Sequence, residues 1–214
     1  MFYAEGRWLS VFVLARLVKI TCMHSIPRLL VFLAFTFIIL SGCEKHEKST
    51  DQKKVYFDLK GFIDNQIVYL SEKKPPLIKH AMLDGTQEDH TIKVVDWKKE
   101  LELFMQADIN KPAYNNSYSV DSSRANFLHY SLKTTEKLPV RDLQIQLDSV
   151  TRVPVFVKAL LQSENKIYKS EKTIQLHCTK KNNLWGISGY AVTGYQKLVL
   201  MDKREFNITA EIGL

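Results

Sequence analysis

The chain has 214 residues, of which 45% are hydrophobic, and this apolar content excludes an intrinsically disordered protein. Its formal net charge of +7 falls to +4 without positions 1–43, which hold four basic residues and one acidic residue. The other basic residues are scattered, which does not fit the basic patch of a nucleic-acid-binding protein. The length fits one domain.

An apolar run near the N-terminus, Leu29–Leu40, follows Arg28 and ends at Leu40-Ser41-Gly42-Cys43. Basic residues, an apolar run of about 7–15 residues and small residues at its end are typical of a secretory signal. The last four residues match a bacterial lipobox, in which the cysteine receives a lipid. The run is shorter than the ~20 residues of a transmembrane helix. We expect residues 23–42 to be a lipoprotein signal peptide and Cys43 to be lipidated, with a retained membrane anchor as the alternative.

A second apolar stretch, Trp8–Ile20, lies upstream of this signal and contains Arg16 and Lys19. Secretory signals normally begin shortly before their apolar run. We therefore expect translation to start at Met23 and residues 1–22 to be an annotation extension. Residues 43–54 are polar and charged, so we expect a lipidated tether between the membrane and the domain.

The first predicted element of the domain is an amphipathic helix from 55 to 70, ended by Pro75-Pro76. Two short apolar runs, Leu77–Leu83 and His90–Val95, then flank Asp84-Gly85. An Asp-Gly pair between such runs is typical of a β-hairpin. The apolar residues of the helix fall at spacings of three and four: Val55, Leu59, Phe62, Ile63, Ile67 and Leu70.

A second helix is predicted from Trp97 to about Asp108, with Asp96 as its N-cap. Its apolar stripe is more typical of core than of a ligand site. The connection that follows is longer than most and gathers polar and aromatic side chains, as binding loops do. We therefore predict a binding rim there, with tyrosines that merely pack on the sheet edge as the alternative. The rim residues are Asn110, Lys111, Tyr114, Tyr118 and Arg124.

From Phe127 onward the apolar residues recur with a period of two, which predicts β-strands. Short turns between consecutive strands favour an antiparallel meander, and one apolar face per strand requires a cover. We predict a single α+β domain over residues 55–214, in which two N-terminal helices and a hairpin pack on a curved antiparallel meander of six or seven strands. Alternating rows begin at Leu143, Val153, Ile174, Trp185, Tyr195 and Phe206.

The sequence contains no common catalytic motif. Cys178 alternates with Ile174 and Leu176, which indicates a buried small hydrophobic residue rather than a reactive thiol. The adjacent His177 points to the opposite face of the strand. The pair therefore cannot form a catalytic dyad, and we predict no catalytic residue.

We also predict no metal ion and no cofactor. His80 and His90 lie on the two arms of the predicted hairpin, where an even-length loop places them on opposite faces. Asp84, Glu88 and Asp89 cluster in one turn, but their spacing matches no calcium loop. A solvated acidic turn is the favoured interpretation.

Three strings of the chain, together with the lipobox, resemble uncharacterised lipoproteins of Bacteroidetes-type bacteria. The strings are Phe57-Asp58-Leu59-Lys60-Gly61-Phe62-Ile63, Asp96-Trp97-Lys98-Lys99-Glu100-Leu101 and Ala107-Asp108-Ile109-Asn110-Lys111-Pro112-Ala113. The resemblance spans most of the mature chain and implies no reaction, ligand or catalytic residue. Surface-displayed lipoproteins of that group often carry an acidic stretch after the cysteine, whereas Glu44–Lys48 is mixed in charge. We therefore expect an outer-membrane location facing the periplasm.

Together these features predict a membrane-anchored envelope lipoprotein whose domain binds a protein or a lipid without catalysis. One form of this hypothesis resembles the lipoprotein carrier and acceptor folds, in which a curved sheet holds acyl chains under helices. The alternatives are a structural subunit of an envelope complex and a hydrolase acting on envelope glycans or peptides. The expected partners are the membrane, through the lipid on Cys43, and an envelope protein or lipid ligand, but not nucleic acid.

Overall fold

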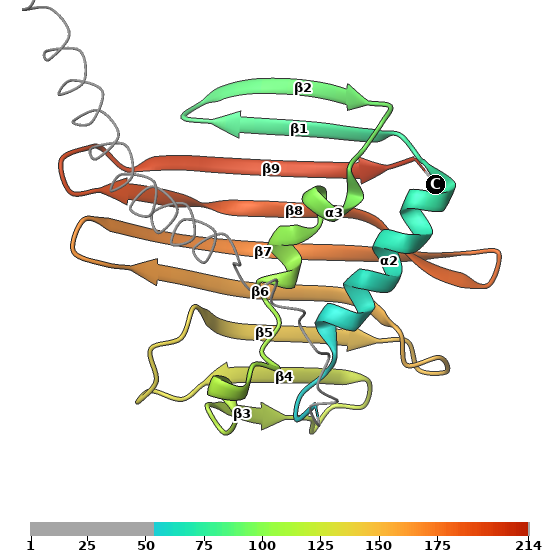
Figure 1. Cartoon of the computed structure of the whole chain (residues 1–214), viewed down its shortest axis with the longest axis horizontal. Helices are drawn as coiled ribbons and strands as arrows, with labels where there is room; N and C mark the ends of the chain where they lie inside the picture. The colour runs from blue at the N-terminus through green and yellow to red at the C-terminus, as the bar shows by residue number, and fades with distance from the viewer. Residues whose placement is uncertain (1–53, 214) are drawn as a thin grey trace, which may run out of the picture. The chain divides into compact units, whose positions relative to one another are not determined.

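The computed structural model describes residues 54–213. The predictions for residues 1–22, residues 23–42 and Cys43 lie outside the described residues, as does all of the tether except Lys54. The described chain forms one antiparallel sheet of nine strands in the order β2-β1-β9-β8-β7-β6-β5-β4-β3 (Figure 1). In residues 54–213, no helix is both long enough and apolar enough to cross a membrane.

The strands lengthen toward the middle of the sheet and shorten at the β3 edge. β7 and β8 are the longest, with 14 and 15 residues. The strands are β1 (Leu77–Leu83), β2 (Thr86–Ile92), β3 (Tyr118–Asp121), β4 (Phe127–Leu132), β5 (Val140–Leu147), β6 (Pro154–Glu164), β7 (Tyr168–Lys181), β8 (Leu184–Leu198) and β9 (Arg204–Ile212).

The predicted arrangement of two N-terminal helices and a hairpin on a six- or seven-stranded meander is wrong, because a single nine-stranded sheet dominates the domain and helices are few. The hairpin joins the same sheet: β1 pairs with β9, with Leu77 opposite Ile212. The rows that begin at Trp185 and Tyr195 belong to one continuous strand, β8. The pairing of β1 with β9 satisfies backbone N–H and C=O groups that would otherwise lie at an open sheet edge. Local periodicity cannot predict a pairing between strands so far apart in the sequence.

The longest helix, α2 (Leu59–Lys73), begins at Asp58, whose side chain accepts a hydrogen bond from the backbone N–H of Gly61 at 3.0 Å. It ends at Lys74, which adopts a left-handed conformation (φ 49°) and donates its N–H to the carbonyl of Leu70. Asp58 therefore acts as an N-cap, and the turn at Lys74 satisfies one of the last carbonyls of the helix.

The segment predicted as a second long helix is broken at Leu101 into α3 (Trp97–Glu100) and α4 (Glu102–Met105). Leu101 has a φ of −95° and a ψ of 2°, outside helical geometry. A straight helix would present only one narrow stripe of the 97–109 side chains to the interior. The break allows side chains outside that stripe to reach the interior as well. The buried members are Trp97, Leu101, Phe104, Ala107 and Ile109. A short 3₁₀ turn, η1 (Pro112–Tyr114), follows.

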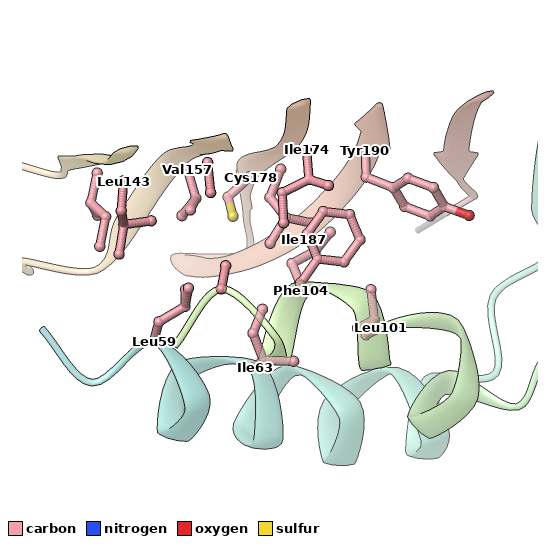
Figure 2. Close-up of a cluster of buried hydrophobic side chains, with 14 of the residues drawn as sticks. Leu59, Ile63, Leu101, Phe104, Leu143, Val157, Ile174, Cys178, Ile187 and Tyr190 are labelled. Atoms are coloured by element: carbon pink, nitrogen blue, oxygen red, sulfur yellow. The ribbon is translucent and has the colours of Figure 1, made fainter. Parts of the chain in front are cut away.

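The hydrophobic core lies between one face of the sheet and the helices α2, α3 and α4 (Figures 1 and 2). Leu59 and Ile63 point from α2 toward the sheet, and Phe104 lies between α2 and the strands (Figure 2). Phe104 also contacts the ring of Tyr190 edge-on, with centroids 5.4 Å apart. The side chains at the centre of this interface are fully buried, so the interior is filled by the protein's own residues.

A register shift between His177 and Cys178 leaves Ser188 as an extra residue on β8, forming a β-bulge. At this bulge the buried side chain of Gln66 crosses from α2. Its Oε1 accepts the N–H of Ile187 at 3.0 Å, and its Nε2 donates to the carbonyl of Trp185 at 3.3 Å. Gln66 thereby pairs backbone groups near the bulge that would otherwise cost free energy.

Candidate functional site

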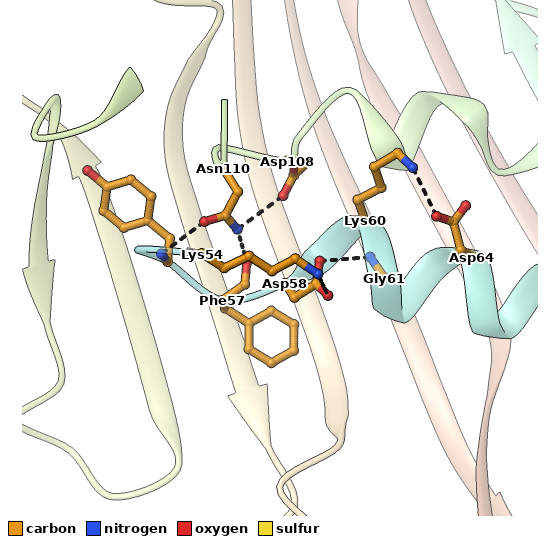
Figure 3. A network of polar contacts seen from close by, with 9 residues as sticks. Lys54, Phe57, Asp58, Lys60, Gly61, Asp64, Asp108 and Asn110 are labelled. Carbon is orange, nitrogen blue, oxygen red and sulfur yellow. Dashed lines mark hydrogen bonds and ion pairs between the residues drawn. The ribbon is translucent and has the colours of Figure 1, made fainter. Parts of the chain in front are cut away.

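The predicted rim residue Asn110 holds the N-terminal segment of the domain against the 108–116 loop (Figure 3). Its Oδ1 accepts the N–H of Tyr56 at 3.0 Å, and its Nδ2 donates to the carbonyl of Phe57 at 2.8 Å. Burial raises the pKa of the neighbouring Asp108, although hydrogen bonds from Asn110 oppose that rise. The amide of Asn110 is thus engaged by the protein's own backbone.

The remaining residues of the predicted rim do not all face one surface. Tyr118 is buried and donates its hydroxyl to the carbonyl of Val140 at 2.9 Å. Burial raises the pKa of Tyr118, which keeps its hydroxyl protonated. Lys111 is exposed, and its Nζ lies 5.2 Å from the ring centroid of Tyr114. Arg124 belongs to a separate pocket.

We expect the Asn110→Ala substitution to destabilise the domain by about 2 kcal/mol. The substitution leaves the N–H of Tyr56 and the carbonyl of Phe57 without their partner in a part-buried setting. Lys111→Ala, at the next position, should change the free energy of unfolding by less than about 0.5 kcal/mol. Urea unfolding of both variants checks this, and equal stabilities would contradict the structural role of Asn110.

Arg124 lines a pocket of about 630 Å³ at the end of the sheet opposite the β8–β9 turn. Its guanidinium lies over the ring of Phe127, 4.3 Å from the centroid. This volume is in the range of ligand pockets. The other lining residues are Ala125, Asn126, Gln146, Leu147, Asp148, Ser149, Val155, Cys178 and Trp185.

Two irregularities of strand register meet at this pocket. One lies between Gln146 and Leu147 on β5, and the other is the bulge beside Cys178. A bulge turns a strand and changes the direction of the side chains that follow it. The pocket therefore forms where the regular pleat of the sheet is interrupted in two strand pairs, β5–β6 and β7–β8.

Trp185 lines the pocket, and among residues 54–213 its buried indole N–H has no hydrogen-bond partner of normal geometry. Asp148 also lines the pocket, and its carboxylate accepts hydrogen bonds from the hydroxyl of Thr151 at 2.6 Å and from the backbone N–H of Thr151 at 2.8 Å. These bonds from Thr151, with a smaller contribution from Trp185, lower the pKa of Asp148. The wall therefore combines a cation, aromatic rings, one carboxylate and an indole donor whose hydrogen bond is incomplete.

Cys178 contributes a buried thiol to the pocket wall, with its sulfur directed toward the core (Figure 2). Burial raises the pKa of this thiol to about 12. Because the thiolate is the nucleophilic form of cysteine, the side chain is inert at neutral pH.

We predict that iodoacetamide at pH 8 modifies Cys178 about a thousandfold more slowly in the folded protein than in urea. The expected difference follows from the thiolate fraction at a pKa of about 12, compared with an unfolded thiol near 8.5. Site-resolved mass spectrometry of the alkylated peptide measures both rates. Similar rates in the two states would mean that Cys178 is accessible and ionised.

His129 lies beside an acid and a hydroxyl on the surface of β4 and β5. Its Nε2 is 2.5 Å from Oδ2 of Asp142 and 3.1 Å from Oγ of Ser131. In a catalytic triad the acid and the nucleophile use different ring nitrogens of the histidine. Here both partners contact Nε2, so the histidine cannot take a proton from Ser131 while Asp142 holds its other nitrogen. The geometry is that of a surface hydrogen-bonded cluster.

Of the three acidic residues predicted in one turn, only Asp84 lies in the β1–β2 turn, because Glu88 and Asp89 belong to β2. The acidic residues and the histidines of the hairpin are paired locally. Asp84 binds Arg204, with 2.7 Å between Oδ2 and Nε, and Asp89 binds His80, with 2.7 Å between Oδ1 and Nδ1. His80 lies opposite Asp89 and His90 opposite Lys79, which places the two histidines on different faces of the hairpin. Within residues 54–213, no three His, Cys, Asp or Glu side chains converge to hold a metal ion.

Sequence reasoning found Arg124 but missed Phe127, Asp148 and Trp185 as its neighbours in one pocket. Those residues come from three separate strands or turns, and only the successive pairing of β4, β5, β6, β7 and β8 brings them together. The local signal for this pocket was the pair of turns, 148–153 and 182–183, at one end of the strands.

No family model, no curated protein and no solved structure matches this chain.

Proposed function

We propose that the chain is a membrane-anchored envelope lipoprotein whose domain binds a polypeptide segment of another envelope protein and catalyses no reaction. The observation that carries this proposal is the pocket lined by Arg124, Phe127, Asp148 and Trp185. A peptide offers both the carbonyl acceptors and the apolar side chains that these groups suit.

The chemistry of the pocket wall favours a peptide over an acyl chain. The polar groups of this wall include the guanidinium of Arg124, the carboxylate of Asp148 and the indole N–H of Trp185, and a peptide backbone offers both acceptors and donors to such groups. The guanidinium of Arg124, stacked on Phe127, offers further donors beside an aromatic surface. An acyl chain satisfies none of these polar groups.

The packing between helices and sheet also counts against the carrier form of the hypothesis. That form requires a hollow for acyl chains under the helices, whereas Ile63, Leu101 and Leu176 are fully buried in contact with the rest of the core. We therefore place the binding surface at the end of the strands and not under α2.

Catalysis is not part of the proposal, because the pocket wall offers a single carboxylate and a protonated thiol. Hydrolysis of a glycan or a peptide calls for an acid and a base, or a nucleophile and a base, that reach the same bond. The thiol of Cys178, with a pKa of about 12, does not supply the second group. Glycan or peptide hydrolysis is thus less favoured than binding.

Photo-crosslinking tests the proposal in the native envelope. We would replace the exposed Ala125 of the full-length protein with p-benzoylphenylalanine, and place the same probe at Thr91 on the far edge of the sheet as the control. We expect a defined protein adduct at position 125 only. The adduct should be lost in the Arg124→Ala, Trp185→Phe double variant, which removes the cation and the indole N–H while keeping an aromatic ring. Equal adducts at both positions, or an adduct indifferent to the double variant, would contradict a peptide-binding pocket.

A further inference from the structure

Large apolar side chains are exposed together at the turn between β8 and β9. Leu200, at the tip of this turn, is 96% exposed, and Ile167 of the neighbouring β6–β7 turn is 67% exposed. Both turns lie at the same end of the sheet, on the left in Figure 1. We call this group the apolar turn cluster: Ile167, Leu198, Val199, Leu200 and Met201.

The cluster is held in shape by hydrogen bonds between the turns. The N–H of Val199 donates to the carbonyl of Ile167 at 3.1 Å, and that of Met201 donates to the carbonyl of Leu198 at 3.1 Å. On the other side, Asp84 of the β1–β2 turn binds the side chain of Arg204 and the N–H of Glu205. An ordered protrusion loses little conformational freedom when it binds.

Charged side chains lie beside the cluster, on the strands and turns that carry it. The Nζ of Lys203 lies 4.4 Å from the ring centroid of Tyr195 and binds Glu205 at 2.7 Å. Within residues 54–213, the ion pairs at this end include neither the lysines Lys166 and Lys197 nor the carboxylates Asp202 and Glu171, and Glu171 lies near Lys203. Those ion pairs are Lys169–Glu164, Lys203–Glu205 and Arg204–Asp84.

We infer that the apolar turn cluster inserts into the surface of a phospholipid bilayer, as a second contact beside the N-terminal anchor. Exposed apolar side chains with charged side chains beside them match the boundary between acyl chains and headgroups. A contiguous exposed apolar patch on a folded domain marks an interaction surface. The inference rests on the proposed membrane anchorage.

The length of chain between Cys43 and Lys54 agrees with this occupant. Eleven residue steps reach about 35 to 40 Å when extended. The N–H of Phe57 donates to the hydroxyl of Tyr130 on β4. Across the sheet, Tyr130 lies in register with Val192 of β8, four strands away. Leu200 follows Val192 by eight residues. Standard strand dimensions make the separation of Tyr130 and Leu200 about 35 Å. An anchored domain can therefore bring the cluster to the same bilayer, where the anchor keeps it at high effective concentration.

A fluorescent probe beside Leu200 tests the inference. We would reconstitute the full-length protein carrying Met201→Cys, labelled with the environment-sensitive fluorophore NBD, into vesicles of phosphatidylethanolamine and phosphatidylglycerol. The matched control carries the probe at Val150→Cys, which is 85% exposed at the opposite end of the sheet. We expect a blue shift, and quenching by spin-labelled lipid, at position 201 only. Leu200→Ser should lower the ratio of inserted to free turn about tenfold, since burying a leucine is worth one power of ten or more.

The outcomes separate the two proposals and the other occupants. Protein that does not float with the vesicles contradicts both the anchorage and this inference. Protein that floats while its probe at 201 stays as water-exposed as the probe at 150 contradicts this inference alone. A blue shift that disappears when the protein is diluted in excess lipid depends on protein concentration. It would show that a second copy of the chain covers the cluster, and it would contradict bilayer insertion.

Discussion

Replacing Phe104 with alanine is expected to cost about 4 kcal/mol of the free energy of unfolding, a large share of the roughly 5–15 kcal/mol of a typical domain. Phe104 is 1% exposed and lies between α2 and the sheet, where it contacts the ring of Tyr190 (Figure 2). Its removal leaves a cavity bordered by elements that other contacts hold in place. Fully buried neighbours cannot collapse into such a space without losing their own packing.

Leu103→Ala supplies the control for this prediction. Leu103 is adjacent in sequence but only partly buried against the core, so its truncation should cost about 1 kcal/mol. Urea unfolding followed by circular dichroism gives both values, and an unchanged slope against urea shows that the change is one of stability. A cost below about 1 kcal/mol for Phe104→Ala would mean that the 97–109 segment does not cover the sheet.

The alternation of apolar residues predicted the buried side chains correctly where it continues without interruption along a strand. It failed where a bulge moves the buried side chains from odd to even positions within one strand. Residues 174, 176 and 178 of β7 were expected on one face, and Ile174, Leu176 and Cys178 are all buried. On β8 the extra residue Ser188 shifts the register, so Ile187 and Tyr190 are both buried. A period of two that continues through a bulge assigns Tyr190 to the wrong face. Nothing local to the sequence marks that shift.

The extent of the sheet was underestimated for a related reason. The hairpin pattern of residues 77–92 contains no information on which strand lies beside it, and the neighbour is the last strand of the chain, β9. Likewise, Asn110 was predicted for a rim because it lies in a polar loop, yet it bonds to the backbone of Tyr56 and Phe57, more than fifty positions earlier. Long-range partners of this kind follow from the assembled sheet and not from local composition.

A second large loss of stability is expected from Gly194→Ala. A methyl group on Gly194 would lie 2.2 Å from the carbonyl oxygen of Glu171 and 2.8 Å from the Cα of Lys172, both on the paired strand β7. These are backbone atoms, so relief requires β7 and β8 to move apart at the centre of the sheet. We expect a loss of at least about 3 kcal/mol, at the upper end of overpacking substitutions.

The same chemical change at Gly85 isolates this mechanism. Gly85 has a φ of +85° in the β1–β2 turn, and no atom lies within 4 Å of the added methyl. Gly85→Ala therefore introduces backbone strain without steric overlap and should cost about 1–2 kcal/mol. Urea unfolding compares the two variants, and a Gly194→Ala protein as stable as Gly85→Ala would contradict the close approach of β7 and β8. Should Gly194→Ala not fold, its failure beside a folded Gly85→Ala protein supports the same contact.

Because β8 continues into the apolar turn cluster, strand separation at Gly194 should also abolish the bilayer signal of a probe at position 201, whereas Gly85→Ala should preserve it.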